Sequence, residues 1–219
     1  MTIRVLIVDD DPLVRSGLTL MVGGSQHIDV VGEASDGQAA LEWLTHHDAD
    51  VVLMDVRMPI LDGIAATEAI SQRTPAPQVI VLTTFDDDDY VVRALACGAS
   101  GFVLKDTPPP DIVHAIHKVH DGEPMLSPSV TEKLIHRVTH AAPGHNGDEA
   151  SLRVAQLTDR ERGVAIAIGK GLSNAQIAAE LYMSLATVKA HVTQILVKLN
   201  ATNRVQIAVT VHDAGLLTD

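Results

Sequence analysis

Residues 50–59 read Asp-Val-Val-Leu-Met-Asp-Val-Arg-Met-Pro, and this stretch decides the fold. Four consecutive apolar residues lead into Asp55, which is the pattern of a central parallel strand covered on both faces. Pro59 cannot donate a hydrogen bond within a sheet, so the strand has to end near Asp55. Ligands of open α/β sheets bind at the carboxyl ends of the strands. The stretch therefore predicts a buried strand that places Asp55 at a ligand-binding edge.

A second group of acids follows another apolar run. Val5–Val8 leads directly into Asp9 and Asp10, and the segment before the next strand has a helical pattern. Alternating strands and helices of this length predict parallel strands. If the two strands are neighbours, the three carboxylates meet and repel one another unless one is protonated or a cation binds. Several carboxylates suit Mg²⁺, and a carboxylate can take up a phosphoryl group. We interpret the cluster as a Mg²⁺-assisted aspartyl-phosphate site centred on Asp55.

Two more apolar runs end in hydrogen-bond donors. Residues 79–83 end in Thr83, and residues 101–105 end in Lys105. Taken singly, such a threonine is more often a turn residue and such a lysine a solvated strand end. At one sheet edge with three acids, a hydroxyl and an ammonium are the donors that a bound phosphoryl group requires.

Residues 3–120 resemble the receiver domain of bacterial two-component response regulators. The matching pieces are Asp9-Asp10, residues 53–59 with Asp62-Gly63, Leu82-Thr83 and residues 101–105. The resemblance implies a doubly wound, five-stranded parallel sheet of the flavodoxin-like kind. It also implies that Asp55 accepts a phosphoryl group from a phosphohistidine on a sensor histidine kinase.

The same resemblance implies roles for the other residues at this edge. Asp10 would bind Mg²⁺ directly, Asp9 would act through water, and the backbone carbonyl of Arg57 would be a further ligand beside Asp55.

Thr83 and Lys105 would hold the phosphoryl oxygens, and Phe102 would reorient when Thr83 moves. Two features depart from the usual pattern. Asp106 replaces the proline that commonly follows the lysine, so the geometry of that peptide bond is open, and Phe102 lacks the hydroxyl of the tyrosine often found there.

Charge divides the chain into parts with different partners. The net charge of −12 arises within residues 1–121, which carry 7 basic and 19 acidic side chains, whereas residues 151–219 carry 7 and 5. The first part should repel nucleic acid and the last could approach it. Cys97 is the sole cysteine, and neither a signal peptide nor a membrane-length apolar run is present, so we expect a cytoplasmic protein.

The last part of the chain has the pattern of short helices. Thr158 and Glu161 have capping-box spacing, and Ser173 and Ser184 are candidate N-caps of two further helices. The second of these has one apolar stripe, formed by Val188, Val192, Ile195 and Leu199. Two short helices with a tight turn indicate a helix-turn-helix, although small helical hairpins are also common without DNA binding.

Residues 155–217 resemble the LuxR-type helix-turn-helix that ends NarL/FixJ-class response regulators. The residues that carry this resemblance are 157–161, 171–178, 187–192, Ile195, Lys198-Leu199 and Asn203-Arg204. It implies base-edge contacts by Lys189, Ala190 and Thr193, whereas Lys198 and Arg204 would contact phosphates or stabilise the fold. The final helix, 203–214, is the expected dimer face.

The predicted organisation is a receiver domain over 1–121, a linker with its own helix over 122–151, and an all-α helix-turn-helix domain over 152–219. The turn-rich residues 141–148 are expected to be flexible, because their composition cannot offset the entropy of ordering.

The predicted function is a phosphorylation-switched transcription regulator that dimerises on activation and binds promoter DNA. Two alternatives stay open. An aspartyl-phosphate phosphohydrolase would usually carry a second acid two residues after the nucleophile, where this chain has Arg57. A pure protein-docking module would leave the last domain without a role.

Overall fold

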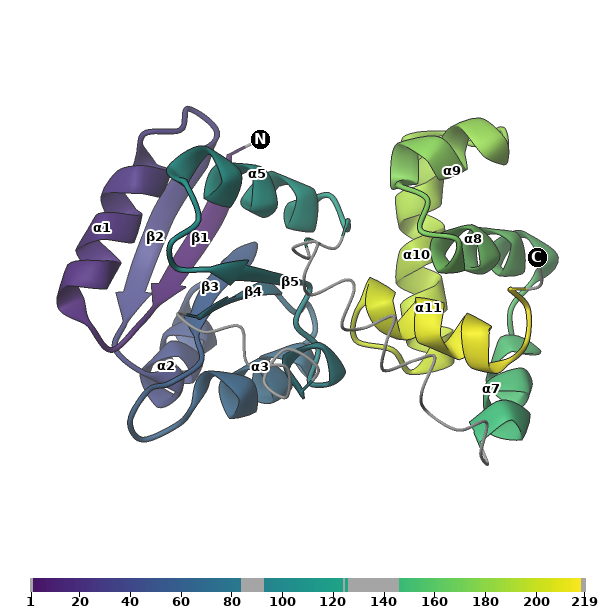
Figure 1. Ribbon diagram of the computed structural model, residues 1–219, viewed down its shortest axis with the longest axis horizontal. Helices are drawn as coiled ribbons and strands as arrows, with labels where there is room; N and C mark the ends of the chain where they lie inside the picture. Colours follow the sequence, from purple (N-terminus) through teal and green to yellow (C-terminus); the bar gives the residue numbers. More distant parts are fainter. Residues whose placement is uncertain (1, 84–92, 124, 126–145, 218–219) are drawn as a thin grey trace. The chain divides into compact units, whose positions relative to one another are not determined.

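The computed structural model describes residues 2–83, 93–123, 125 and 146–217 (Figure 1). The chain divides into two compact units, Met1–Lys133 and Leu134–Asp219, which are described separately. The first has a sheet between helices, and the described part of the second is helical. Within the described ranges, every helix is too short or too polar to cross a bilayer.

The first unit is built on one parallel sheet with the order β2-β1-β3-β4-β5. This order confirms the predicted doubly wound architecture, in which the first and third strands are neighbours. The strands are β1 (Ile3–Val8), β2 (Ile28–Ala34), β3 (Val51–Asp55), β4 (Gln78–Thr83) and β5 (Gly101–Leu104).

Helices cover both faces of this sheet (Figure 1). The apolar sides of α1 (Pro12–Gly23) and α5 (Pro109–His120) share one core cluster with β1, β3 and β4. Helices α2 (Gly37–His46) and α3 (Gly63–Ser71) pack against each other and against the sheet. Because α1, α2 and α3 each begin with an aspartate N-cap, the carboxyl edge of the sheet is rich in acids.

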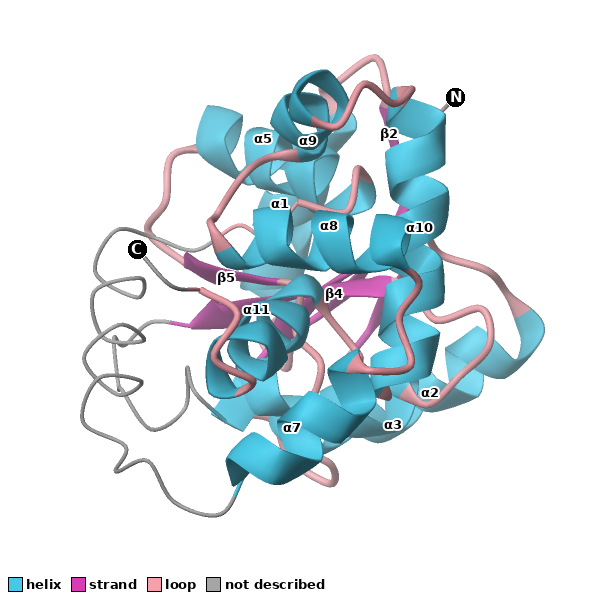
Figure 2. Cartoon of the chain, turned by 90° about the vertical axis from the view of Figure 1, so that its right-hand side faces the viewer, coloured by secondary structure: helices cyan, strands magenta, loops and turns pink. Residues whose placement is uncertain are grey.

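The second unit contains five described helices, which are labelled in Figure 2 and all contribute to one core cluster. Both Thr158 and Ser173 form capping boxes, and Ser184 caps the longest helix, as predicted. All four residues of the predicted apolar stripe are buried. The helices are α7 (Asn146–Val154), α8 (Asp159–Gly169), α9 (Asn174–Glu180), α10 (Leu185–Leu199) and α11 (Arg204–Asp213).

Helix α7 corrects the expectation of irregular chain over 141–148 for the residues from Asn146 onward. It packs against α11 and α10, and buries Ala150 and Val154. The helix could not be predicted from composition, because its stability comes from packing its apolar side against α10 and α11 rather than from local helix propensity. Since α7 runs across 151–152, the proposed domain boundaries stay predictions. The helix expected between Ser127 and His140 lies outside the described residues.

Candidate metal centre and nucleic-acid interface

Three carboxylates meet at the carboxyl edge of the sheet. Strand register places Val8 beside Met54, so Asp9 and Asp55 leave neighbouring strands at the same level. Oxygen atoms of Asp9, Asp10 and Asp55 all lie within 4.8 Å of one another. Asp9 and Asp55 are buried, whereas Asp10 is exposed. The structure thus brings together the three acids that the sequence placed at this edge.

Lys105 lies between two of these acids. Its Nζ is 2.6 Å from Oδ2 of Asp9 and 3.0 Å from Oδ1 of Asp55. The backbone N–H of Lys105 donates to the carbonyl of Thr83 at 2.8 Å, which fixes the end of β5 beside the end of β4. Burial disfavours the ammonium, but hydrogen bonds to Asp9 and Asp55 outweigh it and raise the pKa of Lys105. The lysine is therefore a permanent cation in this cluster.

One ammonium does not neutralise three carboxylates. Burial raises the pKa of Asp55, Lys105 opposes that shift, and the charge on Asp9 adds to it. A hard divalent cation that favours oxygen ligands would relieve the repulsion, and the donor set fits one. The acidic cluster is accordingly compatible with metal binding.

Gly63 sets the backbone geometry behind Asp55. A Cβ atom at this position would lie 1.8 Å from the carbonyl oxygen of Asp55. The N–H of Gly63 donates to the carbonyl of Val56 at 3.0 Å, and Asp62 caps α3 directly beside it. Only glycine permits this approach of α3 to the end of β3. In the sequence, Gly63 is part of the motif that resembles receiver domains. The structure gives the physical reason for a glycine at this position, which is the close approach of the Asp55 carbonyl.

The other residues predicted for this site lie at or near the ends of β3, β4 and β5. Thr83 ends β4 and is buried, and Arg57 is exposed just past β3. Phe102 is buried in β5, and its N–H donates to the carbonyl of Met125 at 2.8 Å. The Lys105–Asp106 peptide bond is trans, since the cis bond among the described residues is Thr74–Pro75.

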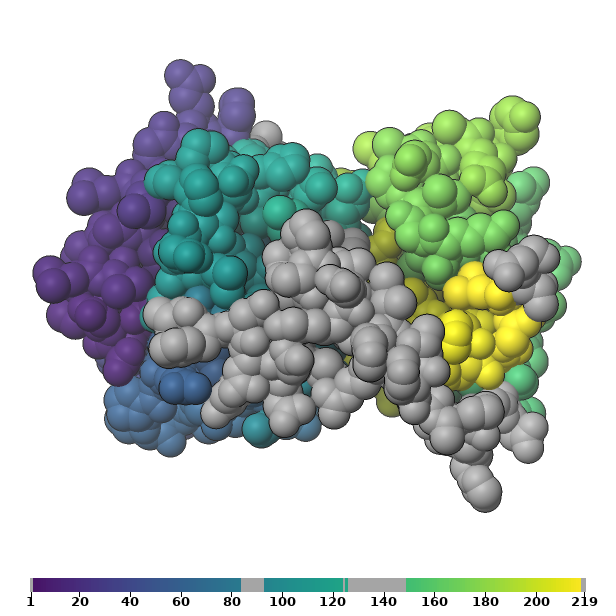
Figure 3. Space-filling model, in the orientation of Figure 1, coloured from purple at the N-terminus to yellow at the C-terminus, as the bar shows by residue number. Residues whose placement is uncertain are grey.

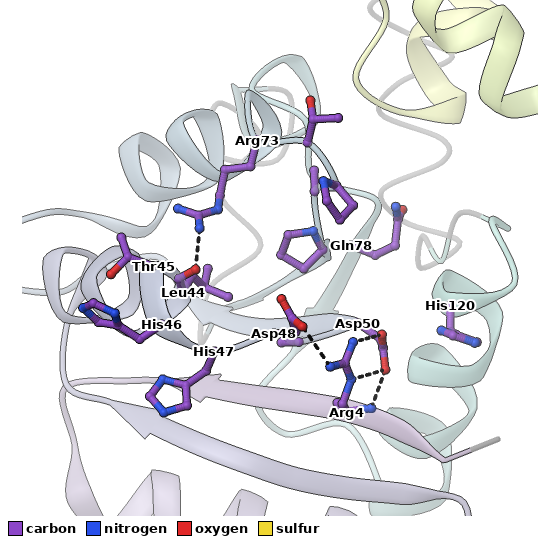
Figure 4. A pocket seen from close by; sticks show the side chains of 15 residues that line it. Arg4, Leu44, Thr45, His46, His47, Asp48, Asp50, Arg73, Gln78 and His120 are labelled. Atoms are coloured by element: carbon purple, nitrogen blue, oxygen red, sulfur yellow. Dashed lines mark hydrogen bonds and ion pairs between the residues drawn. The ribbon is translucent and has the colours of Figure 1, made fainter.

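A pocket elsewhere in this unit is a weaker candidate (Figure 4). Arg4 donates to both carboxylate oxygens of Asp50, at 2.9 and 3.2 Å, and also approaches Asp48. Arg73 donates to the carbonyl of Leu44. Because these charged groups already bind one another or the backbone, the carboxyl edge remains the candidate site.

In the second unit, α9 and α10 form the predicted helix-turn-helix. Ser184 begins α10, and its hydroxyl accepts a hydrogen bond from the N–H of Thr187 at 3.0 Å. Ala190 and Thr193 are exposed and Lys189 is half-buried, so the three predicted base-contacting residues share the side away from the core.

Lys198 and Arg204, which were predicted to contact phosphates or to stabilise the fold, both bind other residues of this unit. The guanidinium of buried Arg204 donates to Oδ1 of Asn174 at 2.6 Å and to the carbonyl of Leu172. Nζ of Lys198 lies 2.6 Å from Oε2 of Glu161. The sequence left a choice between phosphate contact and a structural role, and these contacts favour the structural role for both residues.

Glu161 is the centre of a closed polar cluster. Its Oε2 accepts from Lys198 and from both the N–H and the hydroxyl of Thr158, at 2.6 to 2.9 Å. The hydrogen bond from Lys198, followed by that from the Thr158 backbone, lowers the pKa of Glu161 to about 2. This cluster joins the start of α8 to the end of α10 and so fixes the orientation of α10.

Both units match known families. Residues 5–117 match the response regulator receiver domain, and residues 155–211 match the bacterial regulatory proteins of the luxR family. The transcriptional regulatory protein LiaR of Bacillus subtilis (strain 168) is 39% identical over 210 residues, which cover 96% of this chain and 97% of LiaR.

Solved structures agree with this assignment over nearly the whole chain. The response regulator ChrA of a heme-sensing two-component system is 34% identical, with 99% of each chain covered and a TM-score of 0.52. The response regulator RcsB in a complex with DNA is 25% identical, with 97% of this chain and 99% of that chain covered and a TM-score of 0.56. The chain therefore belongs to the two-component response regulators that join a receiver domain to a LuxR-type DNA-binding domain, and it is a transcription regulator of the NarL/FixJ class.

Proposed function

We propose that Asp55 accepts a phosphoryl group from a phosphohistidine of a sensor histidine kinase. The observation that carries this proposal is the ammonium of Lys105 held against both Asp9 and Asp55 at the sheet edge. An oxygen of Asp55 attacks phosphorus while the bond from phosphorus to the imidazole nitrogen breaks, and the imidazole leaves. The burial that raises the pKa of Asp55 also removes the water that would otherwise shield the attacking carboxylate.

Mg²⁺ is the cation proposed for the acidic cluster. Asp10, Asp55 and the backbone carbonyl of Arg57 would be direct ligands, and Asp9 would act through water. When bound, Mg²⁺ neutralises charge on the carboxylates and on the phosphoryl oxygens. Asp10 is the exposed member of the cluster.

Thr83 and Lys105 would hold the transferred group, and Phe102 would report its presence. The two donors lie on adjacent strand ends that a backbone hydrogen bond joins, so they can contact one phosphoryl group together. Phe102 is buried in the described state. A move of Thr83 towards the phosphoryl group would change the space available to that ring, which biases a two-state equilibrium.

The second unit is proposed to bind promoter DNA as a homodimer in the cytoplasm. Helix α10 would enter the major groove, with Lys189, Ala190 and Thr193 at base edges. Residues 151–219 carry 7 basic side chains, of which Lys198 and Arg204 are bound within the fold. Since few cations are left to neutralise phosphates, one copy should bind weakly, and two copies double the contacts.

Beryllofluoride with Mg²⁺, which mimics the phosphoryl group, tests the switch. We expect the treated full-length chain to double its mass in light scattering and to bind a duplex from its own gene's upstream region more tightly. The Asp55→Asn variant should respond in neither measurement, because it lacks the acceptor carboxylate. Mass and DNA affinity that ignore both the treatment and the substitution would contradict the proposed switch.

A further inference from the structure

Helices α8, α9, α10 and α11 all end in the same backbone motif. A residue one or two positions past the end of each helix has a positive φ, and the N–H of the residue after it donates to the carbonyl five residues earlier, at 2.8 to 3.2 Å. This arrangement is the Schellman motif. The positive-φ residues are Gly171, Tyr182, Asn200 and Gly215, with φ of 79°, 53°, 51° and 69°.

Tyr182 is the exception among these four residues. The left-handed region is free of penalty for glycine and tolerable for asparagine, whereas a tyrosine there brings its Cβ close to the backbone. Side-chain packing does not compensate for this backbone strain, because Tyr182 is 97% exposed. Its neighbours Leu181 and Met183 both pack against the core. The fold therefore depends on the turn but not on the phenol ring, which is accessible to another molecule.

The position of Tyr182 indicates what the ring could contact. It lies in the turn of the helix-turn-helix, two residues before Ser184, the N-cap of α10. Figure 3 shows the α9 region, in light green, at the surface of the second unit. When the start of such a helix enters the major groove, the preceding turn lies at the groove edge, along which the phosphates run. A phenol hydroxyl is a neutral hydrogen-bond donor, and tyrosine is among the residues that bind DNA phosphates.

We propose that Tyr182 is a positioning residue whose hydroxyl donates a hydrogen bond to a backbone phosphate of DNA. The contact would fix how deeply α10 enters the groove without reading any base. This inference rests on the proposed DNA binding through α10. It adds a contact on the N-terminal side of that helix, where the structure offers no exposed cation between Leu181 and Thr187.

The test compares Tyr182→Phe with the wild-type full-length chain, both treated with beryllofluoride and Mg²⁺. The probe is a fluorescein-labelled duplex of mixed sequence, and fluorescence anisotropy gives the affinity over a series of KCl concentrations. We expect Tyr182→Phe to bind about tenfold more weakly, because hydrogen bonds to charged groups are among the stronger ones. The slope of log affinity against log salt should not change, because a neutral tyrosine releases no counterion.

Lys189→Gln is the matched comparison for the salt dependence. A lysine that neutralises one phosphate contributes about 0.9 to the slope, so its removal should flatten the salt dependence, which the tyrosine variant should not do. Tyr182→Asn tests the fold, since asparagine suits the left-handed turn. It should unfold at the same temperature as the wild type or higher, and bind DNA at least as weakly as Tyr182→Phe.

Several results would overturn the proposal. If Tyr182→Phe binds DNA with wild-type affinity, the proposed hydroxyl contact is ruled out. This holds even if Tyr182→Asn binds weakly, because the ring rather than the hydroxyl would then contact DNA. Tighter binding by the untreated variants would show that the ring contacts another part of this chain. If the wild-type chain fails to bind the duplex at all, the DNA-binding proposal fails first and this one falls with it.

Discussion

Each unit of this protein places a lysine 2.6 Å from a buried carboxylate, yet the two clusters have opposite properties. In the receiver, Lys105 contacts Asp9 and Asp55, and the pKa of Asp55 is raised. In the second unit, Lys198 contacts Glu161, whose pKa falls to about 2. An ion pair with lysine therefore accompanies a raised carboxyl pKa at Asp55, 3.0 Å from Lys105, and a lowered one at Glu161, 2.6 Å from Lys198.

The two clusters differ in the number of hydrogen-bond donors available to each carboxylate. Glu161 accepts hydrogen bonds from Lys198 and from two groups of Thr158, so three donors stabilise one carboxylate charge. Asp9, Asp10 and Asp55 lie within 4.8 Å of one another and share one cation, Lys105, besides the backbone N–H groups of Asp11 and Val56. A cluster with donors in excess stabilises a fold, whereas a cluster with carboxylates in excess favours binding of a cation. The receiver cluster is thus open and the Glu161 cluster closed.

Gly63→Ala should have the largest effect on stability, because it disturbs the backbone that positions Asp55 in the open cluster. The added Cβ would lie 1.8 Å from the Asp55 carbonyl oxygen, so β3 or α3 has to shift. We expect the receiver to lose roughly 3 kcal/mol of unfolding free energy and the response to beryllofluoride. Urea unfolding can be followed by fluorescence of Trp43, the sole tryptophan, whose ring packs on Gly32 of β2.

Gly17→Ala is the matched control for this substitution. Nothing lies within 4 Å of a Cβ at Gly17, which is inside α1, so alanine should stabilise the receiver by about 0.5–1 kcal/mol. A Gly63→Ala variant as stable as this control would refute the close-approach argument.

A smaller effect is expected for Glu161→Gln, which breaks the closed cluster. At pH 6, loss of the charge should destabilise the second unit by about 1 kcal/mol, since the charged acceptor of the Lys198 ammonium becomes a neutral amide oxygen. Between pH 4.5 and 2 the unfolded state binds more protons than folded Glu161, so the wild type loses this stability as the pH falls.

The difference in melting temperature between the wild type and Glu161→Gln should accordingly shrink from pH 6 to pH 3. Amide hydrogen exchange of α8 and α10 localises the effect to the second unit. A difference that is constant over this range would mean that the charge of Glu161 contributes nothing to the fold.

Asp55→Asn should give the smallest effect, with the opposite sign. Because burial raises the pKa of Asp55, the ionised form lowers stability near neutral pH, and the amide should raise the receiver's melting temperature by about 2 °C in EDTA. As the pH falls through the raised pKa towards 3.8, the folded state takes up the proton first, so the wild type gains stability relative to the variant. Calorimetry at pH 7 and pH 4.5 checks both signs, and a destabilised Asp55→Asn at pH 7 would refute the comparison.

The open cluster could be predicted from sequence because local patterns and chain topology specify it. Apolar runs that end in Asp9, Asp55, Thr83 and Lys105 define strands, and parallel connections bring their ends to one edge. Membership of a transcription regulator family also resolves the choice against a phosphohydrolase, in line with Arg57 at the position where a phosphohydrolase would usually carry a second acid.

The closed cluster was harder to predict because its partners are far apart in the sequence. Glu161 and Lys198 are 37 residues apart, and Arg204 reaches Asn174 across 30 residues. From sequence alone, a basic side chain in a DNA-binding domain is expected to contact phosphate. Only the packed structure shows that Lys198 and Arg204 have partners within the domain. Helix α7 was missed for the same reason, since its stability depends on α11 rather than on its own sequence.

A bridge between β5 and Met125 holds the chain that follows α5 at the edge of the sheet. Met125 pairs with Gly101, accepts from the N–H of Phe102 and donates to the carbonyl of Ser100. These contacts join Met125, which follows α5 in the chain, to the edge strand beside Phe102. A displacement of β5 at that ring would therefore move Met125 with it.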